Sequence, residues 1–241
     1  MADQNKTSPR IAVVTGGTRG IGEGVARALA AEGWHVVAGG IGDEEIAAFK
    51  PDPAIEPVKL DVTDDRSVAT LIERCPRIDA LVNCAGILLK ANEFNIESFT
   101  KVLDVNLVGT MRMCVAAKPK LAAAKGVIVN TASMYAYFGA PHAPAYAASK
   151  GGVAQLTKSL AIAWAADGIR VNAVAPGWID TDMARGAMQD PARAGPILAR
   201  TPMGRWGKPD DVASVVTFLV SEAAHFVTGT VLPIDGGYLV A

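Results

Sequence analysis

Short, uninterrupted apolar runs recur along the chain, separated by longer segments with helical periodicity. The runs are IAVVT (11–15), HVVAG (35–39), DALVN (79–83), GVIVNTAS (126–133) and IRVNAVAP (169–176). Most of them do not alternate polar and apolar residues, which indicates strands buried on both faces, as in a parallel sheet. The segments at 21–32, 64–74, 96–122 and 145–167 are expected to be helices. This order predicts an α/β fold with one doubly wound parallel β-sheet flanked by helices on both faces.

No repeat, low-complexity segment or linker divides the 241 residues, so we expect one domain spanning 1–241. Residues 1–9 form a polar N-terminal tail without the apolar core of a signal peptide. The segment from about 177 to 208 is rich in proline and glycine and shows no clear strand. We expect it to be a flexible, substrate-binding region with short helices, because long loops in compact domains often bind ligands.

The composition excludes several classes of protein. The net charge is −1 without a charged block, which argues against binding to nucleic acid or to a membrane surface. No apolar run approaches the roughly 20 residues of a membrane span. The three cysteines show neither CxxC nor Cys/His spacing, so we expect no metal site and reduced thiols in a cytoplasmic protein.

The first apolar run leads directly into a glycine-rich turn, TGGTRGIG (15–22), and then into a helical segment. Gly16 allows the tight turn, Gly20 lets the backbone approach a phosphate, and Gly22 permits close packing of helix on strand. The helix N-terminus offers free N–H groups and the positive end of its dipole to a pyrophosphate. The pattern indicates a Rossmann-type dinucleotide-binding domain; the alternative is a glycine-rich turn that only links strand and helix.

A second set of polar residues is expected near the same edge of the sheet. Tyr146 and Lys150 in YAASK lie four residues apart on one face of a predicted helix. An ammonium beside a phenol stabilises the phenolate and lowers its pKa from about 10; the alternative is a surface pair that shares a helix face by chance. Ser133 ends a predicted central strand, at the edge where ligands bind. Asn106 lies within a predicted helix, where a buried amide needs partners.

Taken together, these motifs resemble the single-domain type of the short-chain dehydrogenase/reductase family. The resemblance runs from residue 11 to about residue 238, and the ordered set is far more specific than any single motif. Besides the glycine turn, Asn106, Ser133 and YAASK, the matching segments are LDV (60–62), NCAG (83–86), PGWIDTDM (176–183) and VTGTVLPIDGG (227–237). NCAG stands where NNAG is commoner, a departure that does not fall on a catalytic position.

The resemblance implies four catalytic residues. Tyr146 would be the general acid/base on the substrate oxygen, and Lys150 would lower the pKa of Tyr146 and bind the nicotinamide ribose. Ser133 would hydrogen-bond the substrate oxygen, and Asn106 would hold a water that links Lys150 to a proton relay. No metal is implied.

The resemblance also implies a cofactor site and a substrate pocket. The cofactor contacts would be Gly16, Thr18, Arg19, Gly20, Ile21, Gly22, Asp61, Val62, Asn83, Ala85, Gly86, Tyr146, Lys150, Pro176, Gly177, Ile179 and Thr181. The pocket would be mostly apolar and aromatic, formed by Leu88, Met134, Tyr135, Phe138, His142, Trp178 and Met183. Packing in the core is the alternative for each pocket residue. Cations for a substrate carboxylate would come from Arg185, Arg193 or Arg200.

Three functions are compared. The leading one is an NAD(P)-dependent oxidoreductase, a short-chain alcohol dehydrogenase or carbonyl reductase, that transfers a hydride between the nicotinamide and a small-molecule alcohol or ketone. The second is a 3-oxoacyl-acyl-carrier-protein reductase. Such enzymes present basic residues around the active-site entrance, whereas the matching positions here are Ala124 and Asp167. The third, a non-catalytic dinucleotide-binding regulator, is disfavoured because both Tyr146 and Lys150 are present.

Members of the family with this length usually form tetramers, so the resemblance implies a homotetramer. The long helices at about 96–122 and 144–167 would pair across one interface. The C-terminal strand TVLPID and the tail GYLVA would lie at another.

The segment HVVAGGIGDEE (35–45) bears on the choice between NAD and NADP. NAD-preferring members usually end the second strand with an aspartate, and that position is Gly40; the next residue, Ile41, is often arginine in NADP-preferring members. Asp43 is expected to cap the short helix EEIAAF, and would replace the missing acid only if the turn swung inward. Because Arg19 would reach a 2′-phosphate, we expect NADP, with NAD as the alternative.

Overall fold

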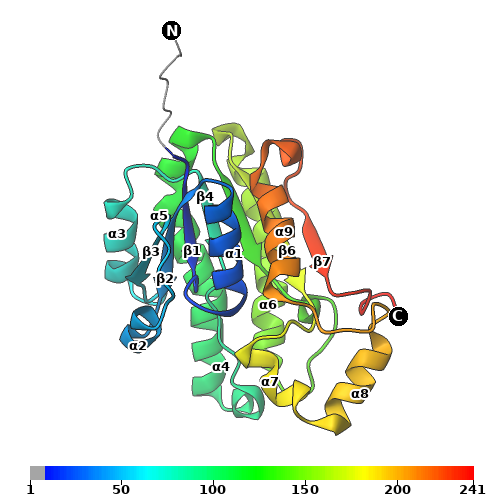
Figure 1. Ribbon diagram of the computed structural model, residues 1–241. Helices are drawn as coiled ribbons and strands as arrows, with labels where there is room; N and C mark the ends of the chain where they lie inside the picture. Colours follow the sequence, from blue (N-terminus) through cyan, green and yellow to red (C-terminus); the bar gives the residue numbers. More distant parts are fainter. Residues whose placement is uncertain (1–8) are drawn as a thin grey trace.

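The central feature of the computed structural model, which describes residues 9–241, is one parallel sheet (Figure 1). Within that range seven strands lie in the order β3-β2-β1-β4-β5-β6-β7. Their bounds are β1 (Ile11–Thr15), β2 (His35–Gly40), β3 (Ile55–Lys59), β4 (Ala80–Asn83), β5 (Val127–Thr131), β6 (Arg170–Pro176) and β7 (Val231–Ile234). The order reverses between β1 and β4, so their carboxyl ends form the switch point at which ligands bind in such sheets.

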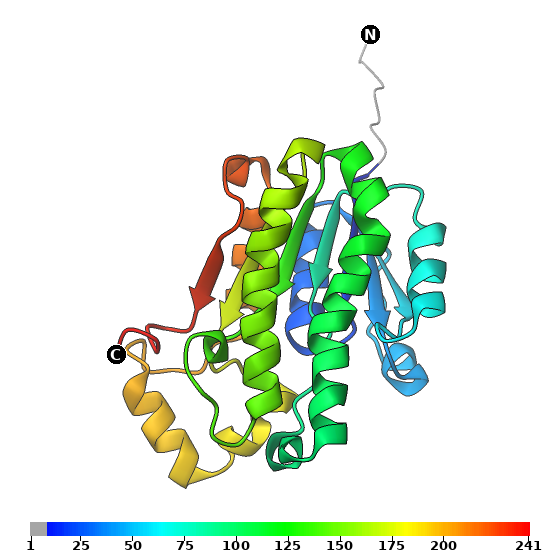
Figure 2. The same cartoon turned by 180° about the vertical axis from the view of Figure 1, so that it is seen from behind.

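Helices cover both faces of the sheet. They are α1 (Gly20–Ala31), α2 (Asp43–Ala47), α3 (Asp65–Arg74), α4 (Ile96–Leu103), α5 (Gly109–Ala124), α6 (Pro144–Trp164), α7 (Asp182–Met188), α8 (Pro191–Arg200) and α9 (Pro209–Val220). Helices α1 and α9 lie on the face seen in Figure 1, and α3, α5 and α6 cover the opposite face, seen in Figure 2. The predicted doubly wound α/β fold is confirmed.

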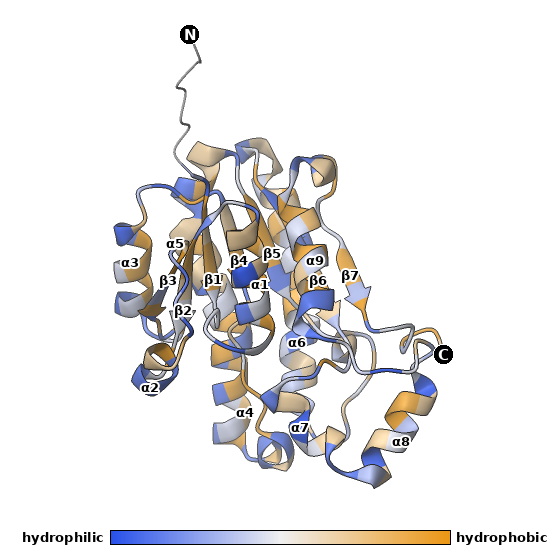
Figure 3. Cartoon of the chain, viewed as in Figure 1, coloured by the Kyte–Doolittle hydropathy of each residue, from blue (hydrophilic) through white to orange (hydrophobic). Residues whose placement is uncertain are grey.

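The core is divided into two layers by the sheet. Successive residues of a strand point to opposite faces. Val13 and Ile128 are therefore buried in the layer beneath α3, α5 and α6, whereas Val14 and Val129 are buried beneath α1 and α9. Hydrophobic residues gather on the central strands and on the helix faces that meet them (Figure 3). The uninterrupted apolar runs of the sequence arise from this burial on both faces.

The structure departs from the sequence-based expectations at several elements. β3 was not expected, because IEPVK carries a proline and two charged residues and forms an edge strand that pairs only with β2. Helix α9 was also missed, although Val212, Val216 and Leu219 follow a helical spacing and are buried. The single helix expected at 96–122 is divided by a π-helical segment, Asp104–Val108, into α4 and α5.

The segment at about 177–208 contains the expected short helices, α7 and α8, and the C-terminal strand TVLPID corresponds to β7. The expected polar tail at 1–9 lies outside the described residues except for Pro9. No helix of the described part, residues 9–241, is long and apolar enough to cross a membrane.

Candidate active site

The glycine turn connects β1 to α1 at the switch point. Gly16 has a φ of +62°, which favours glycine, and a Cβ on Gly22 would lie 2.0 Å from the Gly16 carbonyl oxygen. No side chain caps the N-terminus of α1, which leaves its first N–H groups free for an anion. Across the turn, a Cβ on Gly20 would lie 3.5 Å from the methyl carbon of Thr181. Thr181, in the loop after β6, therefore lies next to the glycine turn.

At the carboxyl end of β2, an acid that the sequence analysis did not select lies against the glycine turn. Glu45 accepts a hydrogen bond from the Thr18 hydroxyl and lies 3.7 Å from Nε of Arg19. The expectation for Asp43 is wrong, since Gly42 is the N-cap of α2 and no side chain caps it. Asp43 instead forms an exposed ion pair with Lys59, at 2.9 Å.

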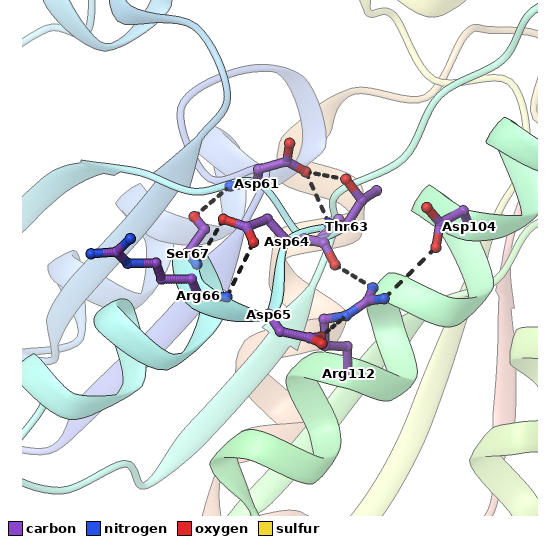
Figure 4. A network of polar contacts seen from close by, with 9 residues as sticks. Asp61, Thr63, Asp64, Asp65, Arg66, Ser67, Asp104 and Arg112 are labelled. Carbon is purple, nitrogen blue, oxygen red and sulfur yellow. Dashed lines mark hydrogen bonds and ion pairs between the residues drawn. The ribbon is translucent and has the colours of Figure 1, made fainter.

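The loop after β3 carries Asp61 and Val62, both expected beside the adenine. Asp61 Oδ1 accepts hydrogen bonds from the backbone and hydroxyl of Thr63, at 2.9 and 2.7 Å. Arg112 of α5 donates to the Val62 carbonyl oxygen at 2.7 Å and pairs with Asp65 (Figure 4). These bonds hold the loop against α5 and leave the second oxygen of the Asp61 carboxylate without a partner in Figure 4.

Lys150 and Tyr146 lie near the N-terminus of α6, as their spacing predicts. The Lys150 side chain is buried, and its Nζ donates to the Thr131 carbonyl oxygen at 2.6 Å and lies 5.6 Å from the centre of the Tyr146 ring. Ser133 follows β5 and accepts a hydrogen bond from the Tyr135 amide at 3.2 Å. The fold therefore brings Ser133, Tyr146 and Lys150 together at the carboxyl edge of β5.

Asn106 joins this group from the π-helical segment. Its Oδ1 accepts from the Ile87 amide at 2.8 Å, and its Nδ2 donates to the Ile87 carbonyl oxygen and to the Ser149 hydroxyl, at 3.0 and 3.1 Å. A Cβ on Gly86 would lie 3.3 Å from Asn106 Oδ1 and 3.7 Å from Lys150 Nζ. Asn106 is thus a buried amide with all its polar atoms bonded, and it ties the loop after β4 to α6.

Loss of solvent shifts the pKa values of Tyr146 and Lys150 in opposite directions. Burial raises the pKa of Tyr146 to about 12, against an opposing hydrogen bond from Ser133. Burial also lowers the pKa of Lys150 to about 8. The expected lowering of the Tyr146 pKa is therefore not observed in the protein alone, because loss of solvent disfavours the phenolate. At neutral pH Tyr146 is protonated and Lys150 is mostly an ammonium ion.

Glu93 was missed by the sequence analysis. Its carboxylate is 1% exposed and accepts hydrogen bonds from the amides of Leu89 and Tyr146, each at 2.9 Å. It lies at the positive end of the α6 dipole and raises the Tyr146 pKa by its charge. A fully buried acid between a loop and the first turn of a helix has no local pattern that would reveal it.

Four of the expected pocket residues form an aromatic and apolar wall beside Tyr146. Tyr135 packs edge-to-face on Tyr146, on Phe138 and on Trp178, with ring centres 6.2, 5.3 and 6.4 Å apart. Met134 is buried in the same cluster. The wall gives the neighbourhood of Tyr146 an apolar side.

The other three expected pocket residues are not buried in this cluster. His142 is exposed in the turn before α6, Met183 is exposed on α7, and Leu88 lies half-buried in the loop after β4.

The remaining cofactor positions lie at or after the carboxyl ends of β4 and β6. Pro176 ends β6, and Ile179 in the following loop is buried beneath α1 and α9. Ala85 donates from its amide to the Thr15 hydroxyl at 3.1 Å, which holds the NCAG loop on β1. The side chain of Asn83, which ends β4, is buried in the core and donates to Asn130 at 2.9 Å.

Ala124 and Asp167, the two positions aligned with carrier-protein contacts, lie away from the carboxyl edge of the sheet. Ala124 ends α5, and Asp167 follows α6 and pairs with Lys118 at 3.0 Å. Tyr146 lies near the other end of α6, so the rise of the helix places Asp167 about 30 Å from it. Asp167 therefore does not lie beside Tyr146 of the same chain.

A glycine turn at the switch point, together with a half-buried tyrosine and a buried lysine at the carboxyl edge of the same sheet, defines a dinucleotide-binding α/β protein with an acid/base site. A sequence-family model described as Enoyl-(Acyl carrier protein) reductase matches residues 16–239. The chain is 41% identical to cis-4-hydroxycyclohexanecarboxylate dehydrogenase of Sinomonas cyclohexanicum, over 95% of this chain and 96% of the relative. It is 37% identical to the 3-oxoacyl-acyl-carrier-protein reductase of Thermotoga maritima, over 96% and 98%.

Among solved structures, the fold is similar to a gluconate 5-dehydrogenase from Burkholderia cenocepacia in complex with NADP and tartrate. The TM-score is 0.90, the identity is 34%, and the match covers 96% of each chain. The chain belongs to the short-chain dehydrogenase/reductase family. The predicted family, fold and reaction class, an oxidoreductase acting on CH–OH groups, are confirmed at this level.

Proposed function

We propose that this chain is an NADP-dependent alcohol dehydrogenase or carbonyl reductase acting on a small molecule, with NAD as the alternative cofactor. The observation that carries the proposal is the group formed by half-buried Tyr146 with buried Ser133 and Lys150, together with a glycine turn whose helix has no side-chain cap. The NADP in the structure of the similar gluconate 5-dehydrogenase supports NADP, whereas Arg19, the cation expected to reach a 2′-phosphate, is paired with Glu45 in the protein alone. The bound nicotinamide would supply or accept the hydride.

The residues of the chain would supply position and a proton. Tyr146, protonated at neutral pH because its pKa is about 12, donates its proton to a substrate carbonyl oxygen. Ser133 hydrogen-bonds the same oxygen, and the Lys150 ammonium holds the nicotinamide ribose. Because Tyr146 is protonated before any cofactor binds, it can donate the proton that reduction of a substrate carbonyl requires. Oxidation of an alcohol would require this pKa to fall when the cofactor binds.

Carboxylated alcohols and the corresponding ketones are the substrate class that we favour. The relative from Sinomonas cyclohexanicum is named for a hydroxy acid, and the similar structure is a gluconate 5-dehydrogenase. Arg200 of α8 stacks over Phe138 and Tyr238, at 5.4 and 4.3 Å, next to the aromatic wall. Burial raises the pKa of Tyr135, and the charge of Arg193, on the same helix as Arg200, partly opposes that rise. These two arginines are suited to hold a carboxylate.

The alternative, a 3-oxoacyl-acyl-carrier-protein reductase, is supported by the identity to the Thermotoga maritima enzyme. Asp167 and Ala124 do not provide the basic patch that an acidic carrier requires, although they lie far from Tyr146 of the same chain. Comparing kcat/KM for a carrier-linked acetoacetyl group with that for small ketones decides between the two. A far higher value for the carrier-linked substrate would favour the alternative.

The proposed activity is tested by screening hydroxy acids and ketones while following nicotinamide absorbance, with both cofactors in parallel. Tyr146→Phe removes the transferable proton but keeps the ring, so we expect turnover to fall by about 10² or more while cofactor binding is retained. Tyr137→Phe is the matched control, because Tyr137 is exposed and its hydroxyl bonds only the Val231 carbonyl oxygen among the described residues. Near-normal turnover in Tyr146→Phe would refute the assigned role.

A homotetramer is the assembly that we propose. The observation that supports it is a set of large apolar side chains left exposed on the helices and C-terminal segment expected at interfaces. They are Val108, Val115, Ile162 and Val240. A cytoplasmic location is proposed with it, because all three cysteines are free thiols.

A further inference from the structure

The carboxyl end of β2 carries an acid that comes from α2 and not from the strand. The Glu45 carboxylate accepts a hydrogen bond from Thr18 and lies 3.7 Å from Nε of Arg19. Its side chain is 19% exposed, whereas that of Arg19 is 59% exposed. The carboxylate is therefore held against the glycine turn, and the guanidinium reaches toward solvent above it.

Gly40 explains how Glu45 reaches this place. A Cβ on Gly40 would lie 2.4 Å from the Thr18 hydroxyl oxygen and 3.1 Å from Oε1 of Glu45. The Thr18–Glu45 pair thus fills the space that a side chain at position 40 would take. The missing side chain at position 40 therefore does not leave space for a phosphate, because the carboxylate of Glu45, the third residue of α2, occupies that space.

The neighbouring acids do not share this position. Asp43 is 79% exposed and pairs with Lys59 on the outer side of the turn. Glu44 is exposed on α2. Among the three consecutive acids, only Glu45 is directed at the turn that would hold the adenosine ribose.

We propose that Glu45 sets the choice between NAD and NADP in this chain. A carboxylate at the end of β2 accepts hydrogen bonds from the ribose hydroxyls of NAD and repels a 2′-phosphate. Glu45 also pairs with Arg19, the cation that a 2′-phosphate would need. NADP binding must separate this pair, so Glu45 lowers the affinity for NADP in two ways. The inference rests on the dinucleotide site proposed above.

The test is a calorimetric titration of the cofactor-free protein with NAD and with NADP. Glu45→Gln keeps an acceptor for the Thr18 hydroxyl and removes the charge. We expect its affinity for NADP to rise by about tenfold or more, and its affinity for NAD to change by less than about threefold. Glu44→Gln removes the same charge from the adjacent exposed position and should leave the ratio of the two dissociation constants unchanged.

A double-mutant cycle separates the two effects of Glu45. If Glu45 restrains Arg19, then Arg19→Ala weakens NADP binding more in the Glu45→Gln background than in the wild type. If the wild type binds both dinucleotides and Glu45→Gln leaves the ratio of their dissociation constants unchanged, the proposed role of Glu45 is overturned while the proposed function stands. An equal change of this ratio in Glu44→Gln would overturn the role of Glu45 in the same way. A wild type that binds neither dinucleotide would instead overturn the proposed function, and the role of Glu45 with it.

Discussion

The variant Lys150→Met tests whether the buried Lys150 ammonium lowers the free energy of unfolding of the protein. The buried Lys150 has a pKa of about 8 in the folded protein against 10.5 in the unfolded chain, a difference that corresponds to about 3 kcal/mol. Methionine keeps most of the apolar length of the side chain and removes the charge. It also leaves the Thr131 carbonyl oxygen without the Lys150 donor, at a cost of about 1–3 kcal/mol. We therefore expect the variant to lose activity but to be about as stable as the wild type at neutral pH, or more stable.

The pH dependence distinguishes this explanation from a simple change in packing. Because the folded pKa lies below the unfolded one, the unfolded chain binds more protons between about pH 8 and pH 10.5, and the stability of the wild type rises with pH in that window. The full penalty is present below about pH 8. We expect the free energy of unfolding of the wild type, relative to Lys150→Met, to rise by about 2–3 kcal/mol from pH 7 to pH 10.

The measurement is urea unfolding followed by tryptophan fluorescence, at equal subunit concentration for each protein. Lys158→Met is the matched control, because Lys158 is exposed on the same helix. It should show no comparable dependence on pH. If the difference between the wild type and Lys150→Met stayed constant from pH 7 to pH 10, the argument from burial of the ammonium would be refuted.

Two further outcomes are expected. Glu93→Gln removes the buried charge that raises the Tyr146 pKa, so the loss of carbonyl reduction at high pH should begin at a lower pH, and the pH–rate profile checks this. The free energy of unfolding of Glu93→Gln in urea should also be lower by about 1–3 kcal/mol, because a neutral amide oxygen accepts weaker hydrogen bonds than a carboxylate from the backbone amides of Leu89 and Tyr146. An unchanged pH–rate profile together with unchanged stability would contradict this role of Glu93. For assembly, light scattering should return four chains of 25.0 kDa, about 100 kDa, and a mass near a single chain would exclude the tetramer.

Local patterns in the sequence were sufficient for the class of fold, and the ordered motifs of the family indicated the candidate reactive residues. Strands buried on both faces produce uninterrupted apolar runs, and these identified β1, β2, β4, β5 and β6. The same reasoning failed for β3, since an edge strand with one neighbour need not be apolar. The proximity of Tyr146 and Lys150 was predictable because a helix places residues four apart on one face, whereas their candidate roles came from the resemblance to the family.

Only the tertiary structure decided how these groups behave. The pKa values of Tyr146 and Lys150 depend on burial, which is produced by elements distant in the chain. Glu93 meets Tyr146 across 53 residues and Glu45 meets Thr18 across 27. The sequence around residue 40 showed that an acid was missing from the end of β2. That another carboxylate fills the same space depends on how α2 packs against the glycine turn, and such long-range packing has no local pattern in the sequence.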